Sequence, residues 1–317
     1  MDYADLIRRA WQITWRYKFL WIFGILMALC GQGNNSRINF QFNVRGSSGQ
    51  FPQFPDLPPW VTDLPIAVYV VAGLLALLIF WAISLIVGAI GRSALIRAAA
   101  RAEAGEELSL AQSWRDGLAK AVPVGLLQLL LSIPMLVLVG ILIVLGLALF
   151  LPLFLQLMDN PQEPPPLASF ISFFPLFFAT VCGFICFSFI IQLFVALFLT
   201  FGSRAIILED QGVLASLGRG WQRFRQNLGP SIILAVIIIV LTFALGLLLA
   251  VPAAAILFPV MFGVMGDLAS GRGLSWLAIL IVAVVGLGIT LIFGIVSGIF
   301  QVFSETLWTL AYRAFLR

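Results

Sequence analysis

The sequence predicts an all-α integral membrane protein with six transmembrane helices arranged as three hairpins. Of its 317 residues, 62% are hydrophobic and only 10% are charged, whereas a soluble domain carries about 25% charged residues. The mean hydropathy is +1.08. Several uninterrupted apolar runs reach the roughly 20 residues that a helix needs to cross a bilayer.

Basic residues gather in segments that would share one side of the membrane. All but three of the 18 Lys and Arg residues lie in the two termini and in two of the loops; the exceptions are Arg37, Arg45 and Arg272. Because basic segments stay inside, both termini are predicted to be cytoplasmic. Such a surface attracts anionic lipid headgroups. Nucleic-acid binding is not expected, since the chain offers no polar domain to present a groove.

A short amphipathic helix is predicted before the first span. Residues 2–18 place four apolar side chains at intervals of four, which gives one stripe along a helix, while Arg16 lies off the stripe. The stripe consists of Tyr3, Ile7, Trp11 and Trp15. This pattern is typical of a helix that lies in the plane of the headgroups. The first span then runs from Phe19 to about Gly31.

Two later segments repeat this arrangement of tryptophan and basic residues before an apolar run. One reads LSLAQSWRDGLAKAVPVGLL and contains Trp114 and Arg115. The other covers residues 207–233 and contains Trp221, Arg223 and Arg225. Each hairpin is therefore predicted to follow a cytoplasmic amphipathic interfacial helix. The chain is interpreted as one membrane domain, 1–317, made of repeat units at about 1–106, 107–212 and 213–317.

The remaining spans follow in order. After a polar outward loop at about 32–63, further spans are predicted at about 64–90, 122–151, 169–201, 230–251 and 276–303. Within the loop, RINFQFNV (37–44) is compatible with one strand of a small hairpin or with a flexible segment resting on the membrane surface.

Glycine, serine and proline indicate where several helices begin and end. Gly105 is predicted to end the helix that continues the second span, and Ser109 resembles an N-cap. Pro123 is predicted to open the third span. Pro252 and Pro259 are expected to interrupt the apolar stretch after the fifth span, so that residues 252–266 bend outward or dip back into the bilayer.

Few polar residues lie within or beside the spans. Ser188 and Gln192 share one face of the fourth span, where they line a solute path or bond to a neighbouring helix. Glu305 is the only carboxylate next to the apolar core of a span, and it is expected at the cytoplasmic interface. Arg92 and Arg204 are the candidate partners for its charge.

Glycine spacing predicts close helix packing, and no catalytic chemistry is evident. Gly294 and Gly298 let another helix approach closely, either within the chain or across a dimer interface. Cys182 and Cys186 share a helix face but form an incomplete metal site. The chain has no histidine, the commonest general base and metal ligand. Without a recognisable catalytic motif, we expect no enzyme, cofactor or metal.

The segment ILEDQGVLASLGRGWQRFRQN (Ile207 to Asn227) resembles a diffuse group of uncharacterised bacterial multi-spanning proteins. This group includes the membrane module attached to some glycerophosphoryl diester phosphodiesterases. The resemblance implies a multi-pass protein of the bacterial plasma membrane. The phosphodiesterase activity of such fusions resides in a separate soluble domain, so the resemblance carries neither that activity nor any functional residue to this chain.

Two functions follow as hypotheses. The first is a non-enzymatic membrane module that binds anionic lipids, a membrane-protein partner or a second copy through its aromatic and basic helices. The alternative is a transporter or permease for a small solute or lipid. In that case Gln192 and the proline-containing third and fifth spans would line the path.

Overall fold

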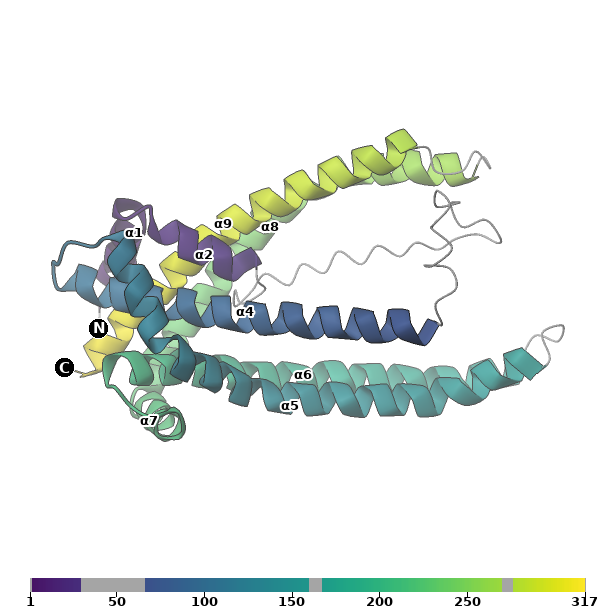
Figure 1. Ribbon diagram of the computed structural model, residues 1–317, viewed down its shortest axis with the longest axis horizontal. Coiled ribbons are helices and arrows are strands. Elements are labelled where there is room, and N and C mark those ends of the chain that lie inside the picture. The colour runs from purple at the N-terminus through teal and green to yellow at the C-terminus, as the bar shows by residue number, and fades with distance from the viewer. Residues whose placement is uncertain (1, 30–65, 160–166, 270–275, 317) are drawn as a thin grey trace. The chain divides into compact units, whose positions relative to one another are not determined.

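The computed structural model describes residues 2–29, 66–159, 167–269 and 276–316 (Figure 1). Within these ranges the regular structure is entirely helical. The described helices are α1 (Tyr3–Arg16), α2 (Leu20–Leu29), α4 (Ile66–Glu103), α5 (Leu110–Asp159), α6 (Leu167–Leu208), α7 (Val213–Gln226), α8 (Leu228–Ala269) and α9 (Trp276–Leu316). The outward loop at 32–63, with its candidate strand, lies outside the described residues.

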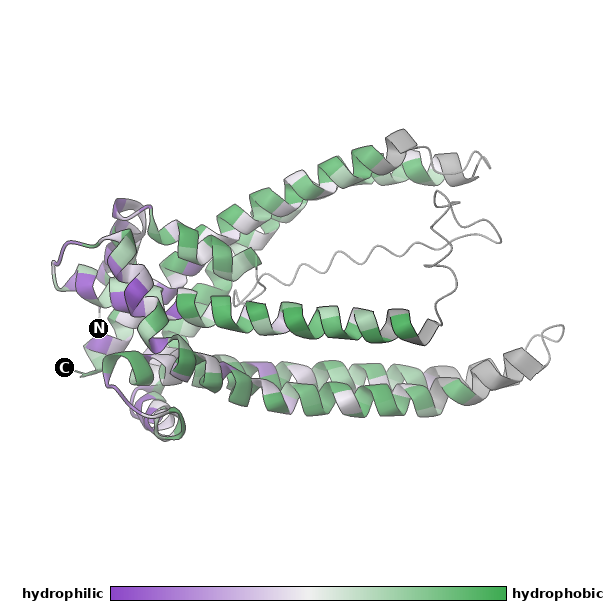
Figure 2. Ribbon diagram, viewed as in Figure 1, coloured by the Kyte–Doolittle hydropathy of each residue, from purple (hydrophilic) through white to green (hydrophobic). Residues whose placement is uncertain are grey.

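Five of the helices are long and apolar enough to cross a membrane: α4, α5, α6, α8 and α9. Figure 2 shows hydrophobic residues along most of their length. The chain is thus an all-α protein with the character of a membrane-embedded one. The first predicted span is described only as α2, whose ten residues extend about 15 Å, half the thickness of the hydrocarbon core. Six spans and the hairpin arrangement remain predictions.

The helix boundaries that were predicted at prolines are wrong. α5 runs for 50 residues without a break, so Pro123 does not open a span and the segment around Trp114 is the beginning of the same helix. α8 also continues through Pro252 and Pro259, which rules out the predicted interruption. In apolar surroundings a proline is tolerated within a helix, because local adjustments and neighbouring groups satisfy the backbone groups that it frees.

Local capping follows the predictions. α4 ends at Glu103, and Gly105 adopts φ +81°, the left-handed conformation that glycine takes up at low cost. Ser109 caps α5, because its Oγ accepts a hydrogen bond from the N–H of Gln112 at 3.2 Å. These boundaries depend only on nearby residues, and the sequence alone was enough to place them.

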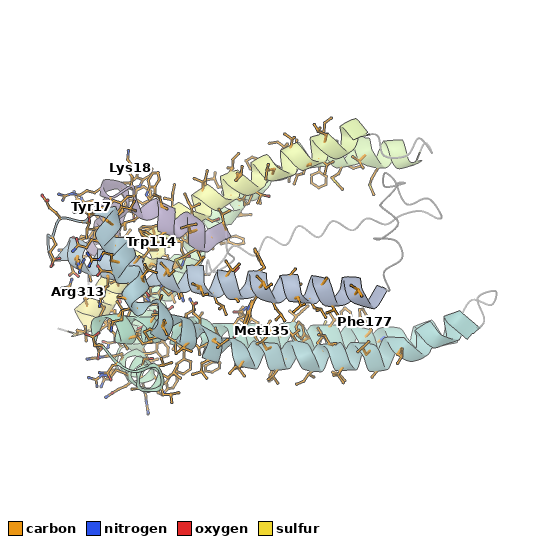
Figure 3. The ribbon with its side chains drawn as sticks, in the orientation of Figure 1. Tyr17, Lys18, Trp114, Met135, Phe177 and Arg313 are labelled. Carbon is orange, nitrogen blue, oxygen red and sulfur yellow. The ribbon has the colours of Figure 1, made fainter. Side chains whose placement is uncertain are left out.

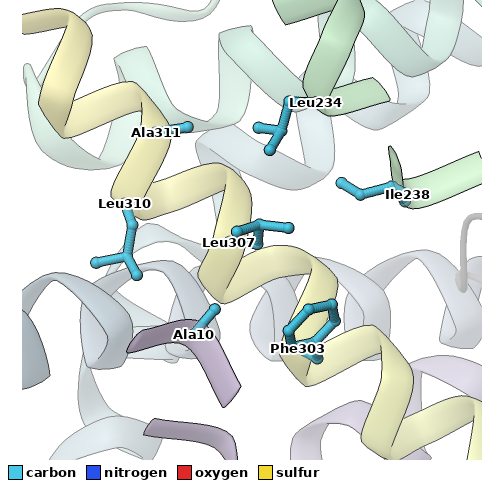
Figure 4. Close-up of a cluster of buried hydrophobic side chains, with 7 residues drawn as sticks. All are labelled: Ala10, Leu234, Ile238, Phe303, Leu307, Leu310 and Ala311. Carbon is cyan, nitrogen blue, oxygen red and sulfur yellow. The ribbon is translucent and has the colours of Figure 1, made fainter. Parts of the chain in front are cut away.

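The chain divides into two compact units. The first contains Met1–Val122 and Arg225–Arg317, and the second contains Pro123–Phe224. In the first unit, α9 packs against α1, α2, α4 and α8. One buried cluster joins α1, α8 and α9 and consists of Ala10, Leu234, Ile238, Phe303, Leu307, Leu310 and Ala311 (Figure 4). A second joins α2, α4 and α9 and includes Phe23, Met27, Leu95 and Val302.

Glycines bring α2 and α9 into backbone contact. A Cβ at Gly298 would lie 2.6 Å from the Cα of Ile25, and a Cβ at Gly24 would overlap the carbonyl oxygen of Gly298. At Gly294 the Cβ would lie 2.9 Å from Cδ2 of Leu29, a flexible side chain. In this structure, α2 of the same chain occupies the face that carries Gly294 and Gly298.

Gly298→Ala is expected to destabilise the protein. Alanine in a helix normally gains up to about 1 kcal/mol over glycine, but here the added methyl group forces α2 away from α9, and such overpacking costs about 1–3 kcal/mol. Thermal unfolding in detergent should therefore show a lower Tm. Gly288→Ala in the same helix is the control, because no atom lies within 4 Å of its Cβ position. Equal stability of the two variants would contradict close packing at Gly298.

Candidate functional site

Helix α1 has three different faces. Ala10 and Thr14 are fully buried on the side that packs against α9. Trp11 and Trp15 are 53% and 43% exposed and form a second face. A third, polar face consists of Arg8, Gln12 and Arg16, which are all exposed. A helix with one protein-facing, one aromatic and one charged side is suited to the junction of protein, lipid and water.

The apolar stripe predicted for this helix is covered unevenly by the rest of the protein. Tyr3 and Ile7 are partly buried, whereas Trp11 and Trp15 turn outward. The reason is geometric, since a helix has 3.6 residues per turn and residues four apart drift by about 40° at each step. Over the four positions of the stripe, the drift moves the side chains from the core to the outside.

A buried small residue immediately before an exposed tryptophan recurs in the three tryptophan-containing segments. The pairs are Ala10–Trp11, Ser113–Trp114 and Gly220–Trp221. Each small residue is buried, while Trp114 and Trp221 are 43% and 42% exposed. We call these the three small–Trp pairs. The tryptophans were recognisable from the sequence as a recurring pattern. The small residue directly before each of them is a further signal, which the prediction did not use.

Each small–Trp pair belongs to a segment that packs on a long helix. In the first unit, Ala10 packs among α9 residues such as Leu307. At the beginning of α5, a Cβ on Gly117 would lie 2.8 Å from the carbonyl oxygen of Ile90 in α4. In the second unit, a Cβ on Gly220 would lie 3.1 Å from the backbone nitrogen of Gly202 in α6. Small side chains permit this approach, and they direct the following tryptophan outward.

Aromatic contacts fix the junction between α1 and α2. The ring centroids of Trp11 and Trp15 lie 5.5 Å apart, and those of Trp15 and Trp21 lie 5.1 Å apart. Nε1 of Trp21 donates a hydrogen bond to the carbonyl oxygen of Thr14 at 2.9 Å. The ring centroids of Trp114 and Phe23 of α2 lie 5.9 Å apart. Figure 3 shows Trp114 at the start of α5. Trp11 and Trp15 are thus held in place although they are exposed.

The predicted basic contact residues divide into two groups. In the second unit, Oε2 of Glu209 accepts a hydrogen bond from Nε of Arg219 at 3.0 Å. Oε1 of the same carboxylate lies 3.7 Å from Nε of Arg223. Arg223 is therefore partly committed to an internal ion pair. By contrast, Arg16, Arg115 and Arg225 are exposed, and their charges face the surroundings of the protein.

A buried polar seam joins α4 and α9. Nε of Arg92 lies 3.3 Å from Oε1 of Glu305, and the two residues are only 4% and 7% exposed. Nε2 of Gln301 donates to the same carboxylate oxygen at 3.2 Å. Of the two partners suggested from the sequence, Arg92 thus forms an ion pair with Glu305. Two buried charges are tolerated when they are paired in this way.

Further ion pairs extend along the same end of the first unit. Arg313 of α9, labelled in Figure 3, lies 3.1 Å from Glu103 and also donates to the carbonyl oxygen of Ala100. Asp116 of α5 accepts from both Arg97 and Arg101. These pairs connect α4 with α5 and α9, and α5 carries one of the three small–Trp pairs.

Two similar hexapeptides carry the buried arginines Arg92 and Arg204, which the sequence predicted as candidate partners for Glu305. GRSALI (91–96) lies in α4 and GSRAII (202–207) in α6, and every residue in both is buried. Arg204 is 1% exposed, and its Nη1 donates to the carbonyl oxygen of Thr200 at 2.6 Å. The similarity of the two segments could have indicated that their arginines are buried. The prediction instead grouped both arginines with the other basic residues on one side of the membrane.

The predicted intramembrane polar residues Ser188 and Gln192 both lie in α6, in the second unit. The hydroxyl of Ser188 donates to the carbonyl oxygen of Phe184, one turn earlier in α6. Gln192 is exposed on the same helix. Cys182 is partly buried and Cys186 exposed, and both are free thiols.

One protein family matches the chain. Its model, described as a family of unknown function (DUF7544), covers residues 10–311. No curated protein and no solved structure matches. The resemblance to the membrane modules of glycerophosphoryl diester phosphodiesterases gains no support from these comparisons.

Arg92→Met is expected to cost about 3–5 kcal/mol of stability, because it leaves the Glu305 carboxylate buried without its partner. The double variant Arg92→Met/Glu305→Gln should recover most of this loss, since both charges are removed. Thermal unfolding in detergent is the measurement.

Arg9→Met is the matched control for this prediction. It breaks the exposed pair between Arg9 and Asp5, which lie 2.7 Å apart, and such pairs contribute about 1 kcal/mol or less. If Arg92→Met were no less stable than Arg9→Met, the buried pair would not be a structural contact.

Proposed function

Since the chain belongs to the DUF7544 family of unknown function, whose description names no activity, we propose a function from its structure. The protein is a non-enzymatic membrane module that binds lipid headgroups or a membrane-protein partner through the helices bearing the three small–Trp pairs. We place it in the bacterial plasma membrane with both termini in the cytoplasm. The observation that carries this proposal is the repeated exposure of a tryptophan beside a buried small residue.

Tryptophan exposure at three positions supports an interfacial role. Tryptophan has an apolar ring system and one N–H donor, so it is favoured where hydrocarbon meets water. A single exposed tryptophan would be unexceptional. Three of them, each fixed by packing of the preceding residue, indicate surfaces held ready for contact with lipid or with another protein.

The outer part of α4 offers a second kind of surface. Every residue from 71 to 80 is exposed, including Leu77 and Phe80, which are 66% and 64% exposed. This helix therefore presents apolar side chains on all sides over nearly three turns. Lipid, a membrane-protein partner or a second copy of the chain would cover them, in keeping with a module that works by association.

Transport of a small solute or lipid is the second candidate. The α4–α9 seam favours it, because ionisable residues buried between apolar helices often belong to ion or substrate pathways. Arg92 adds to this argument: among the described residues, its Nη1 is buried and has no hydrogen-bond partner. A water molecule, an ion or a solute group would satisfy that donor.

Replacing Trp11, Trp114 and Trp221 together by alanine is expected to release most of the lipid or protein that copurifies with the chain. The reason is the loss of the three aromatic contacts at the interface. Mass spectrometry after extraction into native-lipid nanodiscs measures the bound components. The control replaces Ile239, Val240 and Leu248 of α8 by alanine, because these residues are more exposed than the three tryptophans and lie outside the α4 surface. Unchanged lipid and partner content in the tryptophan variant would contradict the proposal.

A cysteine-accessibility experiment separates the two candidate functions. In a background without native cysteines, Gln192→Cys should not react with a membrane-impermeant thiol reagent if the protein is not a transporter. Gln222→Cys on the exposed face of α7 is the positive control and should react from the cytoplasmic side. Rapid labelling at position 192 would instead indicate a water-accessible path and support transport.

A further inference from the structure

The three small–Trp helices differ in how many of their positive charges are already neutralised. On α7, Arg219 and Arg223 both face Glu209. The start of α5 carries fewer positive charges, and its Asp116 pairs with Arg97 and Arg101 of α4. Within the described residues, each of these two helices presents one exposed arginine outside an ion pair, Arg115 on α5 and Arg225 on α7.

Helix α1 keeps most of its positive charge. Its acidic residues have other roles: Asp2 caps the helix by accepting from the N–H groups of Ala4 and Asp5, and Asp5 pairs with Arg9. Arg8, Arg16 and Lys18 are exposed. Within the described part of the chain, no carboxylate forms an ion pair with any of these three cations.

These three cations lie beside the aromatic face. Arg8 of the polar face lies next to the aromatic face, because Arg8, Trp11 and Trp15 are spaced at i, i+3 and i+7. Arg16 lies in the last turn, with its guanidinium 5.5 Å from the centroid of the Tyr17 ring. Lys18 projects outward from the turn between α1 and α2 (Figure 3). The arrangement places three cations beside two exposed aromatic rings, a combination that favours an anionic membrane interface.

We propose that α1 together with Lys18 is the site that selects anionic phospholipids, whereas α7 and the start of α5 contact lipid with little regard to headgroup charge. This inference rests on the proposed function and adds its ligand class. Arg8, Arg16 and Lys18 contact the phosphate and anionic headgroup, while Trp11 and Trp15 lie against the glycerol and upper acyl region. Aromatic contacts to Trp21 and Phe303 hold these rings in position.

The expected selectivity follows from the number of exposed charges. Each basic side chain near an anionic membrane surface strengthens binding about fivefold, so three together give roughly a hundredfold preference at low salt. Because exposed charges are screened, the preference should fall as ionic strength rises.

The test is native mass spectrometry of the full chain, titrated with phosphatidylglycerol and phosphatidylcholine. The variant Arg8→Gln/Arg16→Gln/Lys18→Gln should lose at least about tenfold of its preference for phosphatidylglycerol. The control variant Arg9→Gln/Arg115→Gln/Arg225→Gln also removes three positive charges but leaves Arg8, Arg16 and Lys18 intact, and it should keep most of the preference. Thermal unfolding of both variants verifies that they are folded.

Three outcomes distinguish this inference from the proposed function. Loss of preference in the α1 variant alone supports the site on α1. Equal loss in both variants, or none in the α1 variant, overturns it. If lipid release by the tryptophan variant persists in that second case, the proposed function stands and only the selectivity site fails; if the tryptophan variant also retains its lipid and partners, both fail.

Discussion

The close contact between α2 and α9 is the constraint on which the rest of the first unit depends. Between apolar helices in a bilayer there is no hydrophobic driving force, so association relies on tight packing and polar contacts. Gly24 and Gly298 supply the packing, since neither position has room for a Cβ. With α2 fixed, the hydrogen bond from Trp21 to Thr14 fixes the end of α1. The orientation of α1 then determines that Trp11 and Trp15 face outward.

Ion pairs supplement this packing, and some basic side chains remain outside them. Arg92 and Glu305 join α4 to α9, and Arg313 and Glu103 repeat the connection closer to the end of both helices. A buried charge that loses its partner is costly, so these residues hold the helices in one arrangement. In the described part of the chain, the exposed cations outside such pairs include Arg8 and Arg16 of α1 and Lys18 directly after it. Some basic residues thus hold helices together through ion pairs, while others are exposed to the surroundings of the protein.

The sequence was sufficient for features that depend on neighbouring residues. Apolar length predicted the long helices, and the turn at Gly105 and the cap at Ser109 followed from local chemistry. Features that depend on contacts distant in the chain were not predictable. Pro252 gave no break because its surroundings tolerate it, and the stripe on α1 divided because α9 covers only part of that helix. The burial of Arg204 likewise requires knowledge of which segments surround α6. The ion pair between Glu305 and Arg92 could be predicted as one of two alternatives, because few charged residues lie near the spans.

The central claim is that the small–Trp pairs hold their tryptophans at the level of the lipid headgroups. Fluorescence quenching by brominated lipids tests this most directly, using variants that keep Trp11, Trp114 or Trp221 while every other tryptophan is replaced by phenylalanine. The account predicts strong quenching by lipids brominated near the glycerol end of the acyl chain and weak quenching by lipids brominated near its terminal methyl group. Quenching that is strongest at the chain end, or absent at all three positions, would contradict it.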